Sequence, residues 1–163
     1  MSDRDAGFSE FVASRHVHLR RVAYLISGDW HQADDLLQTA LAKAYVAWPR
    51  IERDGREEAY VRQIMVRANI DEHRRPWRRH ERGGLDGHDA AAPRGLAHED
   101  RAALLDALAD LAPMVRRAVV LRHWVGLSVA ETAAELGIAE GTVKGYCSRG
   151  LERLQATLSV QRS

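Results

Sequence analysis

The sequence predicts an all-α protein with two small helical domains joined by a flexible linker, the second domain containing a helix-turn-helix. Three observations predict this fold class. Apolar residues recur at helical spacing through about the first 75 residues. This periodicity stops at residues 76–98, where glycine, proline and charged residues dominate. It then resumes and ends in two helices around a tight turn, so we divide the chain into 6–75, 76–98 and 99–159.

Composition limits the classes of protein that remain. Of the 163 residues, 45% are hydrophobic, which is enough for real cores, and the net charge is only +1. A nucleic-acid binder that works alone would often be more basic, so DNA affinity borrowed from a partner is indicated. The single cysteine, Cys147, excludes an intrachain disulfide, and we expect it to be buried rather than redox-active. We find no signal peptide or membrane span and predict a cytoplasmic protein.

Two amphipathic helices open the chain. The first carries an apolar face from Phe8 to Ile26 and ends at Gly28. Asp29 is suited to cap the second helix, which we expect to stop at Pro49 because the residue before a proline is pushed out of the α region. We expect residues 50–57 to form a polar loop.

The second helix also has a polar face. Its members are Asp34, Asp35, Gln38, Thr39 and Lys43. The simplest interpretation of the two aspartates is acids placed near a helix N-terminus, where the helix dipole favours them. A metal site that includes the nearby His31 is disfavoured, because no other residue has ligand spacing.

A third helix is predicted from Glu58 to about Arg75, with Val61, Ile64, Met65 and Ala68 as its core edge. The basic run that follows surrounds Trp77 and comprises Arg74, Arg75, Arg78, Arg79 and Arg82. Basic residues with an aromatic side chain suit a nucleic-acid backbone and a stacked base. A solvated helix end with a packed tryptophan explains the same pattern equally well.

The second half of the chain predicts four helices. One spans Glu99 to Leu111, and the next begins at Pro113, a residue tolerated in a first turn, and stops at Gly126. Arg116, Arg117 and Arg122 fit phosphate contacts or ordinary surface charge equally well.

The last two helices form the helix-turn-helix. Ser128 followed by Glu131 is a capping box, and Gly137 supplies the turn. The second helix of this pair presents an apolar face at spacings of three and four residues, made of Val143, Cys147, Leu151, Leu154 and Leu158.

The opposite side of that helix carries groups that can meet base edges or phosphates: Glu140, Gly141, Thr142, Lys144, Gly145, Ser148, Arg149 and Arg153. This inventory favours a DNA-recognition helix over a purely structural hairpin. The two glycines allow a close approach to DNA, or they reflect relaxed local sequence. We expect Lys144 and Arg149 to act unequally, one reading a base and the other contacting a phosphate.

Three runs carry a resemblance to a known family: ADDLLQTALAKAYVAWPRI (33–51), EEAYVRQIMVRANIDEHRR (57–75) and LADLAPMVRRAVVLRHWVGLSVAETAAELGIAEGTVKGYCSRGLERL (108–154). In this order they resemble bacterial RNA polymerase sigma factors of the extracytoplasmic-function type, a group of the sigma-70 family, and most closely its short actinobacterial branch. The chain departs from the usual pattern at Ala139, where a capping serine or threonine is common, and at Gly145 and Gly150. These departures bear on the promoter sequence.

The resemblance implies a non-enzymatic transcription factor without a cofactor. Its partners would be core RNA polymerase, promoter DNA and, in some members, an anti-sigma factor. It implies polymerase binding by Asp34, Asp35, Gln38 and Thr39, and contact with the opened minus-ten element by Arg62, Asn69, Asp71 and Arg74. The helix from Glu140 to Arg153 would read the minus-thirty-five element.

Two other functions are weighed against this one. A free-standing helix-turn-helix regulator would act as a dimer and bind a palindromic duplex without polymerase. An enzyme would use a site around His16, His18, His31 or His73, but no phosphate loop, nucleophile motif or metal spacing supports it.

Overall fold

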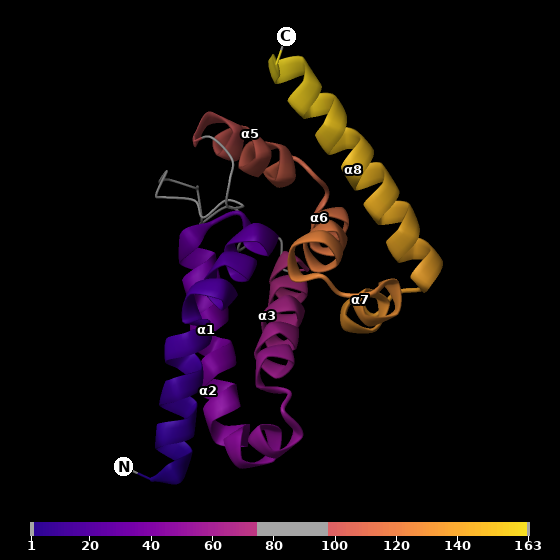
Figure 1. Cartoon of the computed structure of the whole chain (residues 1–163). Coiled ribbons are helices and arrows are strands. Elements are labelled where there is room, and N and C mark those ends of the chain that lie inside the picture. The colour runs from indigo at the N-terminus through magenta and orange to yellow at the C-terminus, as the bar shows by residue number, and fades with distance from the viewer. Residues whose placement is uncertain (1, 75–97, 163) are drawn as a thin grey trace. The chain divides into compact units, whose positions relative to one another are not determined.

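The computed structural model describes residues 2–74 and 98–162, with side chains for residues 2–74 and 99–160. The chain divides into two compact units, Met1–Gly84 and Leu85–Ser163, each of which is described by itself. Every described element is a helix, as the all-α prediction requires (Figure 1). The basic run beyond Arg74 and residues 76–97 of the predicted linker lie outside the described residues, whereas residue 98 already belongs to a helix.

The first unit is a three-helix bundle in which each helix contacts the other two. Its helices are α1 (Asp3–Ser27), α2 (Trp30–Asp54) and α3 (Glu57–His73). The predicted boundary between the first two is confirmed, since Gly28 ends α1 at a φ of 78°. Asp29 then caps α2, and its Oδ1 accepts a hydrogen bond from the His31 amide at 2.9 Å.

The predicted end of the second helix at Pro49 is wrong. Helix α2 runs through the proline to Asp54, and Gly55, at a φ of 64°, ends it instead. A proline removes one helical hydrogen bond, here the one that the Tyr45 carbonyl would accept. In this chain the Arg4 side chain donates to that carbonyl, so the helix continues.

The core of the first unit follows the predicted apolar faces. Fully buried side chains come from all three helices: Leu19, Val22, Ala23, Ile26, Ala33, Leu37, Ala40, Ala44, Trp48, Val61, Met65 and Val66. At one end of the bundle, Trp48 meets Phe8 and Phe11 at centroid distances of 5.4 and 5.3 Å. This aromatic cluster joins the start of α1 to the second half of α2.

The second unit contains α5 (His98–Ala109), α6 (Pro113–Val119), a π-helical segment η1 (Val120–Val125), α7 (Val129–Leu136) and α8 (Glu140–Arg162). Pro113 begins α6 and Gly126 ends the following segment at a φ of 89°, as predicted. Helix α8 packs against α5, α6 and α7, so one long helix organises the unit (Figure 1).

The helix-turn-helix is confirmed by its local geometry. The Ser128 hydroxyl accepts from the Glu131 amide at 3.0 Å, and the Glu131 carboxylate accepts from the Ser128 amide at 2.9 Å, which is the predicted capping box. Gly137 makes the turn at a φ of 69°. Thr132 and Ala133 are buried where α7 meets α8.

The inward face of α8 differs from the prediction in its second half. Val143, Cys147 and Leu154 are buried, but Leu151 is 41% exposed and Leu158 is only half-buried. Gly150 is buried instead, because α6 crosses the helix there.

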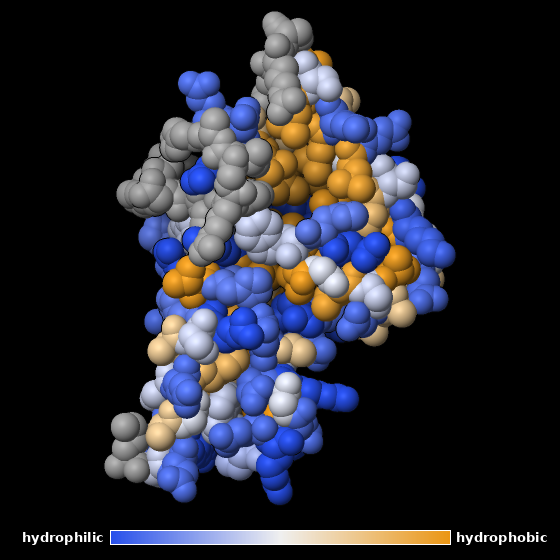
Figure 2. All heavy atoms as spheres, viewed as in Figure 1, coloured by the Kyte–Doolittle hydropathy of each residue, from blue (hydrophilic) through white to orange (hydrophobic). Residues whose placement is uncertain are grey.

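Figure 2 shows hydrophobic side chains gathered over α5 and α8 in this unit. None of the described helices combines the length and the apolar character that a membrane span needs.

Candidate nucleic-acid interface

The outer side of α8 is the candidate DNA-reading surface. All eight residues predicted for it reach the surface, with Thr142 and Gly145 half-buried and the other six exposed. The helix begins directly after Ala139, whose carbonyl accepts the first helical bond from Val143. The exposed N-terminal turns are the part of a recognition helix that enters the major groove.

Arg149 is held in place on this surface. Its guanidinium lies 5.4 Å from the centre of the Tyr146 ring. A methyl group added at Gly145 would come within 3.3 Å of its Nη1, so the missing side chain leaves room for the guanidinium. The glycine that departs from the usual sequence therefore accommodates the arginine one turn later. The contact with Tyr146, worth about 0.5–1 kcal/mol at an exposed site, favours this position of the guanidinium before DNA binds.

Two arginines predicted as surface or phosphate-contacting residues are not at the surface. Arg116 and Arg117 in α6 are buried, Arg117 to 2% exposed. Burial lowers the pKa of Arg116, and burial together with the neighbouring Arg116 charge lowers the pKa of Arg117 to about 10. Arg122 is half-buried and donates to the Leu127 carbonyl at 2.6 Å. Arg116 and Arg117 are therefore not displayed for a phosphate contact, and Arg122 holds the chain that follows Gly126.

The predicted minus-ten residues of α3 divide into two groups. Asp71 and Arg74 are exposed near the end of the helix. Arg62 is 9% exposed and Asn69 is 0% exposed, so both side chains lie inside the bundle of the free chain, and their contact with the minus-ten element stays a prediction. Their burial has a simple cause: both positions fall on the face of α3 that also carries Val66 and Ile70, which are buried.

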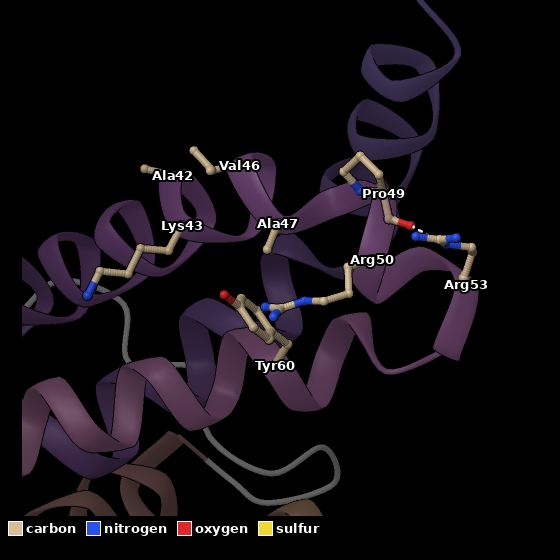
Figure 3. Close-up of a pocket in the computed structure, with 8 residues that line it drawn as sticks. All are labelled: Ala42, Lys43, Val46, Ala47, Pro49, Arg50, Arg53 and Tyr60. Atoms are coloured by element: carbon tan, nitrogen blue, oxygen red, sulfur yellow. Dashed lines mark hydrogen bonds between the residues drawn. The ribbon is translucent and has the colours of Figure 1, made fainter.

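A basic pocket on the first unit was missed by the sequence prediction. It has a volume of about 790 Å³, opens to solvent and lies between α2 and the start of α3 (Figure 3). Its lining combines apolar and basic side chains: Ala42, Lys43, Val46, Ala47, Pro49, Arg50, Arg53 and Tyr60. The sequence does contain the three basic residues Lys43, Arg50 and Arg53 and the nearby Tyr60. Because residues 50–57 were expected to form a loop, the three basic residues were not placed on one helix.

Two contacts order this pocket, and Figure 3 shows both. The Arg50 guanidinium lies 6.0 Å from the centre of the Tyr60 ring. The Arg53 Nε donates to the Pro49 carbonyl at 3.0 Å. Val46 at the rim is 75% exposed. The pocket thus offers cationic donors beside apolar and aromatic surface, the combination that holds an unpaired base and its phosphate.

The acidic face of α2 lies near the opposite end of that helix. Asp34, Asp35, Gln38 and Thr39 are all exposed, as predicted. Asp34 accepts from Arg20 at 2.7 Å and 3.3 Å, and Arg20 lies over the Trp30 ring at 4.2 Å. The hydrogen bond from Arg20 lowers the pKa of Asp34, so this carboxylate is kept ionised. The described residues hold no group of three metal-ligating side chains.

Comparison with known proteins finds two family models that match separate parts of the chain. Residues 11–79 match the model of sigma-70 region 2, and residues 101–154 match that of sigma-70 region 4. The RNA polymerase sigma-E factor of Streptomyces coelicolor is 40% identical over 157 residues, covering 93% of this chain and 85% of that protein. The ECF RNA polymerase sigma factor SigM of Mycobacterium tuberculosis is 34% identical, covering 93% and 76%.

A solved structure shares the fold as well. The sigma factor RpoE of Bartonella quintana, crystallised with the anti-sigma factor NepR, superposes with a TM-score of 0.76 at 25% identity, covering 94% of this chain and 98% of that one. Both recognised regions, their order along the chain and the near full-length relatives agree with one another. The chain therefore belongs to the extracytoplasmic-function sigma factors of the sigma-70 family.

Proposed function

We propose that the chain binds core RNA polymerase and directs promoter-specific initiation, with α8 reading the minus-thirty-five element and the first domain opening the minus-ten element. One observation carries this proposal. A region 2 match and a region 4 match occur in one chain, and each falls on a domain with a suitable exposed surface. The free-standing dimeric regulator is not favoured, because the first domain, to which that alternative assigns dimerisation, matches sigma-70 region 2.

The exposed acidic face of α2 is the proposed polymerase-binding surface. Asp35, Gln38 and Thr39 lie on it together with Asp34, whose carboxylate is oriented by Arg20. An interface needs side chains that are exposed in the free protein and fixed in position, because ordering them on binding costs entropy. The Arg20 contact supplies that order for Asp34.

The basic pocket is proposed to hold the displaced strand of the minus-ten element. A displaced strand offers phosphates to Lys43, Arg50 and Arg53 and a base face to the ring of Tyr60. Asp71 and Arg74 remain proposed contacts on the exposed end of α3. Unpaired bases captured here are removed from the duplex equilibrium, so binding energy favours strand opening.

The low net charge of +1 is explained if the chain binds DNA only as part of the polymerase complex, through several separate contacts. Affinity would come from polymerase and from two separate DNA contacts, which raise one another's effective concentration once one is made. Such a protein acts where polymerase is, in the cytoplasm. An anti-sigma factor is a proposed further partner, since the similar RpoE was solved with one.

Placing an arginine at Gln38 tests the polymerase-binding surface. A long charged side chain at the centre of an interface prevents close packing, so Gln38→Arg should weaken binding to core polymerase by about 10-fold or more. Gln63→Arg is the matched control, because Gln63 is also exposed on a helix of the same domain. Binding of labelled chain to core polymerase by fluorescence anisotropy gives the comparison. Equal affinities for the two variants would remove α2 from the proposal.

A further inference from the structure

A proline inside α2 leaves one backbone acceptor without its helical donor. The amide of residue 49 would normally donate to the Tyr45 carbonyl four residues earlier, but Pro49 has no N–H. A proline ring in a helix also crowds the carbonyl four residues earlier. A helix in this position would ordinarily bend or end, yet α2 continues for five more residues to Asp54.

Arg4 of α1 supplies the missing donors. Its Nε and Nη2 both donate to the Tyr45 carbonyl oxygen, at 3.1 and 2.5 Å. The same guanidinium lies 4.3 Å from the centre of the Tyr45 ring. The Tyr45 hydroxyl in turn donates to Asp5 at 2.5 Å. Adjacent residues of α1 therefore hold both the backbone and the side chain of Tyr45.

The next turns of α1 hold the same stretch of α2. The Phe8 ring lies 5.1 Å from Tyr45 and 5.4 Å from Trp48 by centroid distance. A methyl group added at Gly7 would lie 2.9 Å from the Glu52 carboxylate and 3.1 Å from the Trp48 indole nitrogen. The absence of a side chain at Gly7 thus lets α1 approach the part of α2 that follows the proline.

We propose that Arg4 is a positioning residue for the basic pocket. By serving the Tyr45 carbonyl it keeps α2 helical beyond Pro49. Only that continuation places Arg50 beside Tyr60 and Arg53 among the residues that line the pocket. The use of the pocket for a displaced DNA strand rests on the proposed function. The coupling of Arg4 to the proline does not, because it is a property of the chain alone.

A double-mutant cycle separates this role from a general effect of charge. In the chain with Pro49, Arg4→Ala should speed amide hydrogen exchange at residues 50–54 by about 5-fold, the effect of one partly exposed hydrogen bond. In a Pro49→Ala background the residue-49 amide serves the Tyr45 carbonyl, so Arg4→Ala should change exchange there by less than about 2-fold. Arg15→Ala, on the same helix and away from Tyr45, is the matched control. Equal effects of Arg4→Ala in both backgrounds, or none in the first, would overturn the proposal.

The functional arm uses the same variants with core polymerase. Arg4→Ala should slow promoter opening by about 5-fold, measured with a fluorescent base in the minus-ten element, while leaving affinity for core polymerase unchanged. In the Pro49→Ala background, promoter opening should proceed at the same rate with and without Arg4→Ala. If the unaltered chain opens no promoter, the proposed function fails. If opening is normal in Arg4→Ala although exchange responds as predicted, the pocket does not depend on Arg4 and the positioning role is wrong.

Discussion

Replacing Gly150 by alanine is expected to destabilise the second domain by about 2 kcal/mol, because the added methyl group would overpack a helix crossing. Its carbon would lie 2.6 Å from Val119 Cγ2 and 3.0 Å from Val115 Cγ1. Both neighbours are β-branched valines with little rotamer freedom, so relief requires α6 and α8 to move apart. At an exposed helix position without close neighbours, replacing glycine by alanine would instead stabilise the domain by about 1 kcal/mol.

The matched control is alanine at Gly141 in the same helix. Nothing lies within 4 Å of a methyl group added there, so Gly141→Ala should raise stability by up to about 1 kcal/mol. Urea unfolding followed by the NMR signals of α6 and α8 gives both values. A stabilising effect at both positions would show that the crossing is looser than the distances indicate.

Arg149 is expected to read a base and Lys144 a phosphate. Arg149 is arranged by Tyr146 and by the space at Gly145, and its planar guanidinium can bind guanine through two hydrogen bonds. Arg149→Ala should therefore cost about 10-fold or more in discrimination at one base pair of the minus-thirty-five element. Arg149→Lys should not restore it, since an ammonium lacks the paired donors.

Lys144 provides the contrast. It is exposed early in α8, and an ammonium acts at phosphate as a point charge. Lys144→Gln should weaken binding to all promoter sequences alike and reduce the dependence of log affinity on log salt concentration by about one. Binding by polymerase loaded with each variant, on templates substituted base by base, distinguishes the two effects. A uniform loss with Arg149→Ala, or a changed base preference with Lys144→Gln, would reverse the assignment.

The elements that sequence predicted correctly depend on local chemistry. The Ser128 capping box, the Asp29 cap and the glycine turns at residues 28, 126 and 137 involve residues within one or two turns of each other. Their physical causes are therefore visible in a short stretch of sequence. The outer face of α8 was predictable for a similar reason, because helical periodicity fixes which residues share a side.

The incorrect predictions depend on tertiary contacts. Pro49 does not end its helix, because Arg4, 45 positions earlier in the chain, takes over the Tyr45 carbonyl. The basic pocket follows from that continuation and was missed with it. A hydrogen-bond donor that another helix supplies to a backbone carbonyl cannot be predicted from the residues near that carbonyl in the sequence.

The burial of some polar side chains also could not be predicted from the local sequence pattern. Arg116 and Arg117 were expected at the surface and are buried, as is Asn69 in α3. Charge is a good guide to exposure on average, but long side chains can bury their stems and even their polar ends where helices converge. Leu151 shows the converse: α6 crosses α8 at Gly150, and the leucine one position later is left 41% exposed.

Run-off transcription with purified core polymerase tests the division of labour between the two domains most directly. Templates would carry an intact promoter, a scrambled minus-thirty-five element, or an intact upstream element with a pre-opened minus-ten region. The unaltered chain is expected to direct initiation from the intact promoter and to fail when the minus-thirty-five element is scrambled. A variant with Arg50 and Arg53 both changed to alanine is expected to lose activity on the intact promoter and to regain it on the pre-opened template. Failure of the unaltered chain to direct initiation from any template in a genomic promoter library would contradict the account.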